Sequence, residues 1–146
     1  PEPRPGAAAM TVFREITDAD VEQVAALWTA CDLTRPWNDP YKDISFARQG
    51  AASTVLVAEH LGRIAATAMV GHDGHRGWVY YLAVRESDRG RGLGRKMMQA
   101  CESWLAKRGV PKLNIMVRGD NAPARGFYES LGYALDDVVV LSRRMD

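Results

Sequence analysis

The strongest chemical signal in this chain is a short run of glycine and arginine, Arg89-Gly90-Arg91-Gly92-Leu93-Gly94. It stands between an apolar stretch, 78–84, and a long amphipathic stretch, 92–108. Amides at the start of a helix lack intrahelical partners and carry partial positive charge, and glycine lets a ligand approach the backbone. With the charges of Arg95 and Lys96 beside it, the run predicts a phosphate-binding turn; the alternative is a tight strand-to-helix connection with solvated arginines.

Other phosphate-binding motifs do not fit this turn. A P-loop requires Lys and then Ser or Thr after its last glycine, whereas Gly94 is followed by Arg95 and Lys96. A dinucleotide-binding Rossmann fold would carry the turn in its first strand-helix unit, whereas several expected strands precede it here. RNA binding is a weaker alternative, because the Arg-Gly alternation is short and lies within folded periodicity.

Apolar periodicity predicts the elements that hold the turn. The stretch 78–84 is almost wholly apolar, as in a strand buried on both faces, so we expect it to be central. The order of elements predicts an α/β domain with a mixed central sheet flanked by helices. Strands are expected at 10–16, 54–59, 63–71, 78–84, 112–117 and 133–144, the last as one strand or a pair, and helices at 21–31, 41–49, 92–108 and 122–131.

Length, charge and cysteine content limit the class of protein. A chain of 146 residues with a formal net charge of +1 is typical of one domain without an overall field toward nucleic acid or an anionic membrane. The cysteines, Cys31 and Cys101, have no paired spacing, so neither disulfides nor a metal site is expected. No apolar run reaches the ~20 residues of a membrane span, and residues 1–9 lack a secretory pattern. We therefore expect a cytoplasmic domain at 10–146 after a flexible tail at 1–9.

Several segments around the turn carry a resemblance. Arg89, Gly92 and Gly94 fit the signature Arg or Gln, two residues, Gly, one residue, Gly or Ala, and the chain resembles the GNAT N-acetyltransferases there, at 80–84 and at 121–133. The segments 31–40 and 73–77 look like those of the YpeA-type bacterial members. The resemblance implies the GNAT acyl-CoA N-acyltransferase fold. It also implies transfer of an acetyl group from acetyl-CoA to a primary amine, on a small molecule or a protein, by direct attack in a ternary complex.

The same resemblance assigns the site for acetyl-CoA. The pyrophosphate is expected on the amides of the turn. The pantetheine arm is expected beside the exposed backbone of 82–84, in a strand that splays from the strand at 112–117. A backbone N–H of that strand would polarise the thioester carbonyl. Asn121 would hold pantetheine, or simply cap a helix. The expected cofactor-binding residues are Leu82, Ala83, Val84, Arg89, Gly90, Arg91, Gly92, Leu93, Gly94, Arg95 and Asn121.

Acetyl transfer also needs groups that move protons. The resemblance makes Tyr128 the acid that protonates the departing thiolate, although a structural aromatic packed on the sheet is the alternative. The expected strand 78–84 has no carboxylate, unlike family members that place a glutamate there. His75 is the candidate base because of its ordinary pKa near ~6.5, against an exposed turn histidine. A water chain touching Tyr80 or Tyr81 would also serve.

The loop that follows the first expected helix is the candidate site for the acceptor amine. A carboxylate there could attract a cationic amine, and a tryptophan could pack against its stem. The alternative is a helix cap, a turn and one buried anchor. The candidate residues are Asp32, Arg35, Trp37, Asn38 and Asp39.

The sequence leaves two further questions open. A non-catalytic acyl-CoA-binding regulatory module would show the same phosphate-binding turn. The expected terminal strand could complete its own sheet or pair with a second subunit, so a homodimer stays open.

Overall fold

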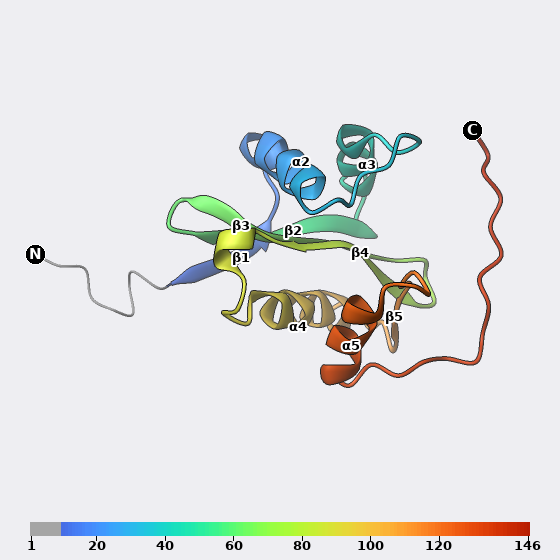
Figure 1. The fold of residues 1–146 in the computed structure, drawn as a ribbon. Helices are drawn as coiled ribbons and strands as arrows, with labels where there is room; N and C mark the ends of the chain where they lie inside the picture. Colours follow the sequence, from blue (N-terminus) through green and yellow to red (C-terminus); the bar gives the residue numbers. More distant parts are fainter. Residues whose placement is uncertain (1–9) are drawn as a thin grey trace, which may run out of the picture. The chain divides into compact units, whose positions relative to one another are not determined.

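The computed structural model describes residues 10–146; the tail expected at 1–9 lies outside the described part. The chain divides into two compact units, the first ending at Met116 and the second running from Val117 to Asp146. Figure 1 shows the first unit as a twisted sheet with helices on both faces. Along residues 10–146, no helix combines the length and the apolar character needed to cross a membrane.

The sheet of the first unit has five strands in the order β1-β2-β3-β4-β5. The first four strands pair antiparallel, and β5 pairs parallel with β4. The predicted mixed sheet is therefore confirmed, with β4 in its interior between β3 and β5. The strands are β1 Thr11–Glu15, β2 Ser53–His60, β3 Arg63–His72, β4 Gly77–Val84 and β5 Leu113–Ile115.

Two helices cover one face of this sheet and a longer helix covers the other (Figure 1). The first face carries a short 3-10 turn, η1 Asp18–Asp20, with α2 Val21–Ala30 and α3 Pro40–Ala47. A second 3-10 turn, η2 Glu86–Asp88, leads to α4 Leu93–Ala106 on the opposite face. Helices thus lie on both faces of the sheet, as in an α/β domain.

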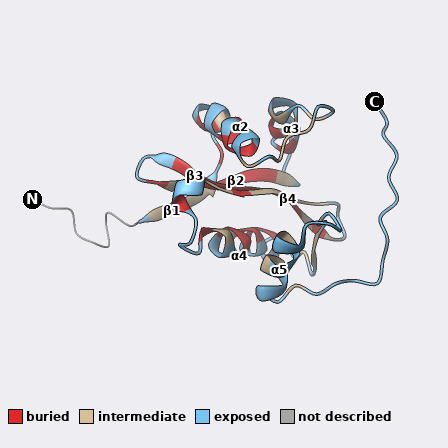
Figure 2. Cartoon of the chain, in the orientation of Figure 1, coloured by how far each residue is buried: buried red, intermediate tan, exposed pale blue. Residues whose placement is uncertain are grey.

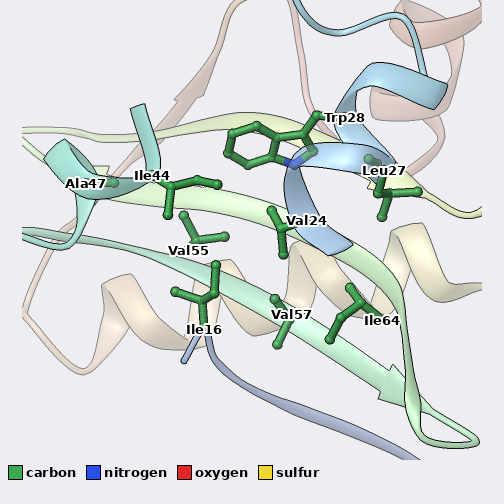
Figure 3. Close-up of a cluster of buried hydrophobic side chains, with 10 residues drawn as sticks. Ile16, Val24, Leu27, Trp28, Ile44, Ala47, Val55, Val57 and Ile64 are labelled. Atoms are coloured by element: carbon green, nitrogen blue, oxygen red, sulfur yellow. The ribbon is translucent and has the colours of Figure 1, made fainter. Parts of the chain in front are cut away.

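Apolar faces of the helices form the core. Figure 2 shows α2 and α4 turning buried residues toward the sheet. The predicted stripe on α4 is confirmed, since Leu93, Met97, Cys101, Trp104 and Leu105 are all buried. On the other face, Trp28, Val24 and Ile44 pack over Val55, Val57 and Ile64, and Figure 3 shows their side chains meeting between the helices and the strands.

Helix α4 lies close to the beginning of β4. A Cβ built at Gly77 would stand 2.5 Å from Leu105 Cδ1, so a larger residue there would force the Leu105 side chain to shift. Because side chains alternate along a strand, Val79 also points toward α4, and Trp78 and Tyr80 point to the face of α2 and α3.

Two expectations about strands are wrong. Strand β4 is not buried on both faces, because Tyr80 is 43% exposed. An apolar or aromatic run does not reveal whether both faces are covered. The terminal strand expected at 133–144 is also absent, because no strand is formed from 131 to 146. Alternating side chains specify a face, whereas a strand also needs a partner backbone.

Candidate functional site

The glycine turn joins η2 to the start of α4. Gly90 and Gly92 have φ values of 82° and 75°, a conformation that favours glycine. No described atom lies within 4 Å of the Cβ position at either glycine. Gly92 is the N-cap residue of α4, which has no side-chain cap, so side chains leave the first amides of the helix free to bind an anion. This geometry suits a phosphate group.

The arginines of the turn are held by neighbouring groups, whereas sequence reasoning treated them as mobile charges. Arg89 Nε donates to the carbonyl of Val84 over 3.2 Å, and its Nη2 lies 3.6 Å from Cys31 Sγ. Arg91 Nη1 lies 3.4 Å from His60 Nε2 and 3.7 Å from Asp88 Oδ1. The guanidinium groups therefore have defined places beside the turn.

Asp88 is a buried counter-charge directly before the turn. Its side chain is 1% exposed, and ion pairs link it to Arg63 at 3.6 Å, Arg85 at 3.9 Å and Arg91 at 3.7 Å. Among the described residues, none forms a hydrogen bond with its Oδ2. Sequence reasoning missed this residue, because an aspartate between polar neighbours gives no sign of burial.

Strand β4 loses its neighbour β5 before it reaches the turn. The parallel pairing comprises Gly77 with Leu113, Trp78 with Asn114 and Val79 with Ile115, where β5 ends. Residues 80–84 have no strand partner on this edge within the described part of the chain. The predicted separation of the two strands is therefore present, and it leaves Leu82 to Val84 without a strand neighbour on that edge, although the carbonyl of Val84 accepts from Arg89 Nε.

The same part of β4 contains a bulge. Met69 pairs with Tyr80 and Thr67 pairs with Ala83, so β4 has one residue more than β3 between these pairs. Tyr81 lies in this bulge with φ 55°, an uncommon conformation for an aromatic residue. Such features persist only where the surroundings fix them, and they concentrate at functional sites.

Four side chains fix the bulge. Thr67 Oγ1 donates to the carbonyl of Tyr81 over 3.1 Å and accepts from Trp28 Nε1 over 2.8 Å. The rings of Trp28 and Tyr81 stack with centroids 3.8 Å apart. The Tyr81 hydroxyl donates to Asp43 Oδ2 over 2.6 Å, and burial together with this bond raises the pKa of Tyr81. Sequence reasoning considered Tyr81 but missed Asp43.

His75 lies at the other end of β4. It is exposed in the turn between β3 and β4, and its amide donates to Asp73 Oδ1 over 2.9 Å. Strand β4 begins at Gly77, and the four extended steps from there to Tyr81 span about 13 Å. This placement matches the exposed turn histidine and does not support His75 as the base.

The α2–α3 loop uses most of its candidate acceptor residues in local bonds. Asp39 caps α3 by accepting from the amide of Tyr41 over 2.9 Å. Arg35 Nη1 donates to the carbonyls of Asp32 and Thr34 over 2.9 and 2.8 Å. Asp32 has φ 57°, as expected just after a helix end.

The other two candidate residues of this loop, Trp37 and Asn38, give little support to an acceptor site. The amide of Asn38 donates to the carbonyl of Arg35 over 3.0 Å. Trp37 is 57% exposed, so it is not a buried anchor. The loop therefore contains the helix cap and the turn of the structural alternative, but not the buried anchor.

The second unit contains the remaining predicted residues. Helix α5 runs from Ala122 to Ser130, as predicted, and Asn121 Oδ1 accepts from the amide of Ala124 over 3.2 Å. The structural role foreseen for Asn121, a helix cap, is thus present. The ring of Tyr128 contacts Tyr133 edge to face with centroids 6.0 Å apart. Its role as an acid stays a prediction.

Comparison with known proteins identifies this arrangement. The model of the Acetyltransferase (GNAT) family matches residues 21–133. The chain belongs to this family. A Yersinia enterocolitica protein named acetyltransferase is 46% identical over 133 residues, covering 91% of this chain and 94% of the relative. A Yersinia pestis protein of the same name is 47% identical over 126 residues, covering 86% and 89%.

Solved structures show the same fold. The aminoglycoside N-acetyltransferase AAC(6')-Iy, solved with a bisubstrate analogue of CoA, has a TM-score of 0.80 and 16% identity, covering 94% of this chain and all of that one. A mutant of the BH1408 protein from Bacillus halodurans has a TM-score of 0.73 and 27% identity over 92% of this chain and 99% of that one. The GNAT protein described here thus has the expected acyl-CoA N-acyltransferase fold.

Proposed function

We propose that this GNAT protein transfers an acetyl group from acetyl-CoA to a primary amine by direct attack in a ternary complex. The observation that carries the proposal is the open edge of β4 at 80–84, which leads directly into the glycine turn. An extended pantetheine arm needs such an edge, and a pyrophosphate needs such a turn. The crystal of AAC(6')-Iy with a CoA bisubstrate analogue gives a precedent for this ligand on the fold.

The residues of the first unit fit acetyl-CoA. The glycine turn offers open space and a helix start without a side-chain cap among the described residues, and Arg89 and Arg91 add positive charge beside it. Acetyl-CoA supplies an acyl carbon that its thioester activates toward amines. A backbone N–H group of the Leu82 to Val84 segment would donate to the carbonyl oxygen as negative charge develops, an effect worth about 3 kcal/mol for one donor.

The family resemblance supplies two further roles in the proposal. Tyr128 would be the acid that protonates the departing thiolate, and Asn121, whose Oδ1 caps α5, would be a residue for pantetheine. The family match covers 21–133 and so reaches into both units, which supports our view of 10–146 as one acetyltransferase domain.

The deciding experiment measures acetyl-CoA turnover by release of free thiol against a panel of small amines and peptides. The shift in melting temperature caused by CoA is recorded in parallel. We expect a shift with CoA and release that depends on the acceptor. A shift without release would favour the acyl-CoA-binding regulatory module, and no shift would refute the proposal.

A matched pair of glycine variants tests whether the turn binds the cofactor. Gly92 and Gly109 begin and follow α4 with the same φ of 75° and the same open surroundings. Valine at either position strains the backbone and destabilises the protein by about 2 kcal/mol. Only Gly92→Val should also lower kcat/KM for acetyl-CoA, by roughly 100-fold. An equal loss of kcat/KM in both variants would show that the turn is not part of the acetyl-CoA site.

A further inference from the structure

The carboxylate of Asp43 lies on the face of β4 that carries α2 and α3. Its Oδ2 accepts from the Tyr81 hydroxyl over 2.6 Å, although the two residues are 38 positions apart. Tyr81 is the bulged residue, and Leu82, whose backbone belongs to the proposed thioester site, follows it directly. Asp43 is therefore one tyrosine side chain away from the part of β4 where the acyl carbon would lie.

This face of β4 is open to an acceptor. Helix α4 covers the opposite face, where Gly77 contacts Leu105 and Val79 is 3% exposed. On the face of α2 and α3, Tyr80 is 43% exposed and Trp78 is partly exposed. The partly exposed rings of Tyr80 and Trp78 and the bond between Tyr81 and Asp43 thus lie on the same face of β4.

The other carboxylates of this region serve different purposes. Asp39 caps α3 through the amide of Tyr41, and the side chain of Asp32 is 97% exposed beside Arg35. Glu22 accepts from the hydroxyl of Tyr41, a bond that links α2 to α3 without involving β4. Of these acidic residues, Asp43 is the one that contacts the bulge.

We propose that Asp43 binds the ammonium group of the acceptor, so that the site selects cationic alkyl amines. This inference rests on the proposed acetyl transfer. A carboxylate can accept several hydrogen bonds, so the bond from Tyr81 orients the group and leaves it able to accept from an ammonium. The exposed ring of Tyr80 adds a surface that attracts cations. Tyr81 acts here as a positioning residue.

The test compares the binding of a charged and an uncharged probe in the presence of saturating CoA. Benzylamine carries the ammonium group, benzyl alcohol is its uncharged match, and spermidine is a second cation. Calorimetry gives the three affinities for the wild type and for Asp43→Asn, Tyr81→Phe and Glu22→Gln. The Glu22 variant is the matched control, because it also removes a carboxylate that accepts from a tyrosine at 3.0 Å.

We expect Asp43→Asn to lower the affinity for both cations at least tenfold and to leave the affinity for benzyl alcohol unchanged. Tyr81→Phe should weaken the cations several-fold, since it removes the orienting bond and keeps the stacked ring, and Glu22→Gln should have no effect. Cation affinity that survives Asp43→Asn, or a wild type that binds neither cation, would overturn the inference. The shift in melting temperature with CoA separates the proposed acetyl transfer from the proposed role of Asp43. A wild type that shows no shift would contradict CoA binding itself.

Discussion

Two buried aspartates lie in regions of different character. Asp20, near the start of α2, receives hydrogen bonds from Arg14 at 2.7 and 3.0 Å, from the Thr17 amide at 2.7 Å and from the Thr17 hydroxyl at 2.9 Å. Asp88, before the glycine turn, has three arginines at 3.6 to 3.9 Å and an Oδ2 without a hydrogen bond.

This difference separates a structural from a functional use of the same chemistry. The bonds around Asp20 saturate its carboxylate and join β1 to the start of α2, so they contribute to folding. Around Asp88, the arginine charges lie 3.6 to 3.9 Å from the carboxylate, so the arginines retain donors for another group. A buried ion pair of this second kind is weak evidence for stability.

The largest effect is expected where the hydrogen bonds around Asp20 are removed. Asp20→Ala leaves the Arg14 guanidinium and the Thr17 amide without their partner, and we expect a loss of about 3 kcal/mol in the free energy of unfolding. Urea denaturation measures this loss. Asp18→Asn is the control, because its pair with Arg48 is exposed and should contribute less than about 0.5 kcal/mol. Affinity for CoA should not change in either variant.

The same region predicts a dependence on pH. The hydrogen bond from Arg14, with those from Thr17, lowers the pKa of Asp20 from 3.8 to about 2. A depressed pKa in the folded state gives stability that is present above the unfolded value and disappears as the pH falls. The wild type should therefore lose about 2 kcal/mol between pH 4 and about 2 relative to Asp20→Ala. Parallel stability curves for the two proteins would contradict this.

A smaller effect is expected around Asp88, and on a different quantity. Asp88→Asn removes the counter-charge that faces Arg63, Arg85 and Arg91; Arg85 keeps its hydrogen bonds to the carbonyl of Ile64, whereas Arg91 loses its ion pair beside the turn. We expect KM for acetyl-CoA to rise about tenfold, or ~1.4 kcal/mol, with kcat retained. Tighter binding instead would mean that Asp88 only reduces the positive charge of the turn.

Local features of the molecule could be predicted from the sequence. The stripe on α4 and the glycine turn depend on residues within a few positions of each other, and both are present. The order of the elements followed from the same local patterns. The open edge of β4 was expected as well, but only through the family resemblance.

Features that depend on distant residues could not be predicted. The bond between Tyr81 and Asp43 joins residues 38 positions apart, and Arg63 at the start of β3 reaches Asp88 in η2. The residues that cap a helix and form a turn in the α2–α3 loop resembled a ligand site, because the same residue types form caps, turns and ligand sites. The segment 133–144 alternates like a strand, yet pairing needs a partner that no pattern specifies.

The burial of Cys101 has a practical consequence for the chemistry of this protein. Its place on the covered face of α4 raises the pKa of the thiol to about 12, which keeps it protonated and unreactive near neutral pH. Cys31 is half-buried and contacts Arg89 of the turn. A thiol reagent should therefore modify the folded protein once per chain. The rate of that single modification then becomes a footprint of whatever occupies the glycine turn.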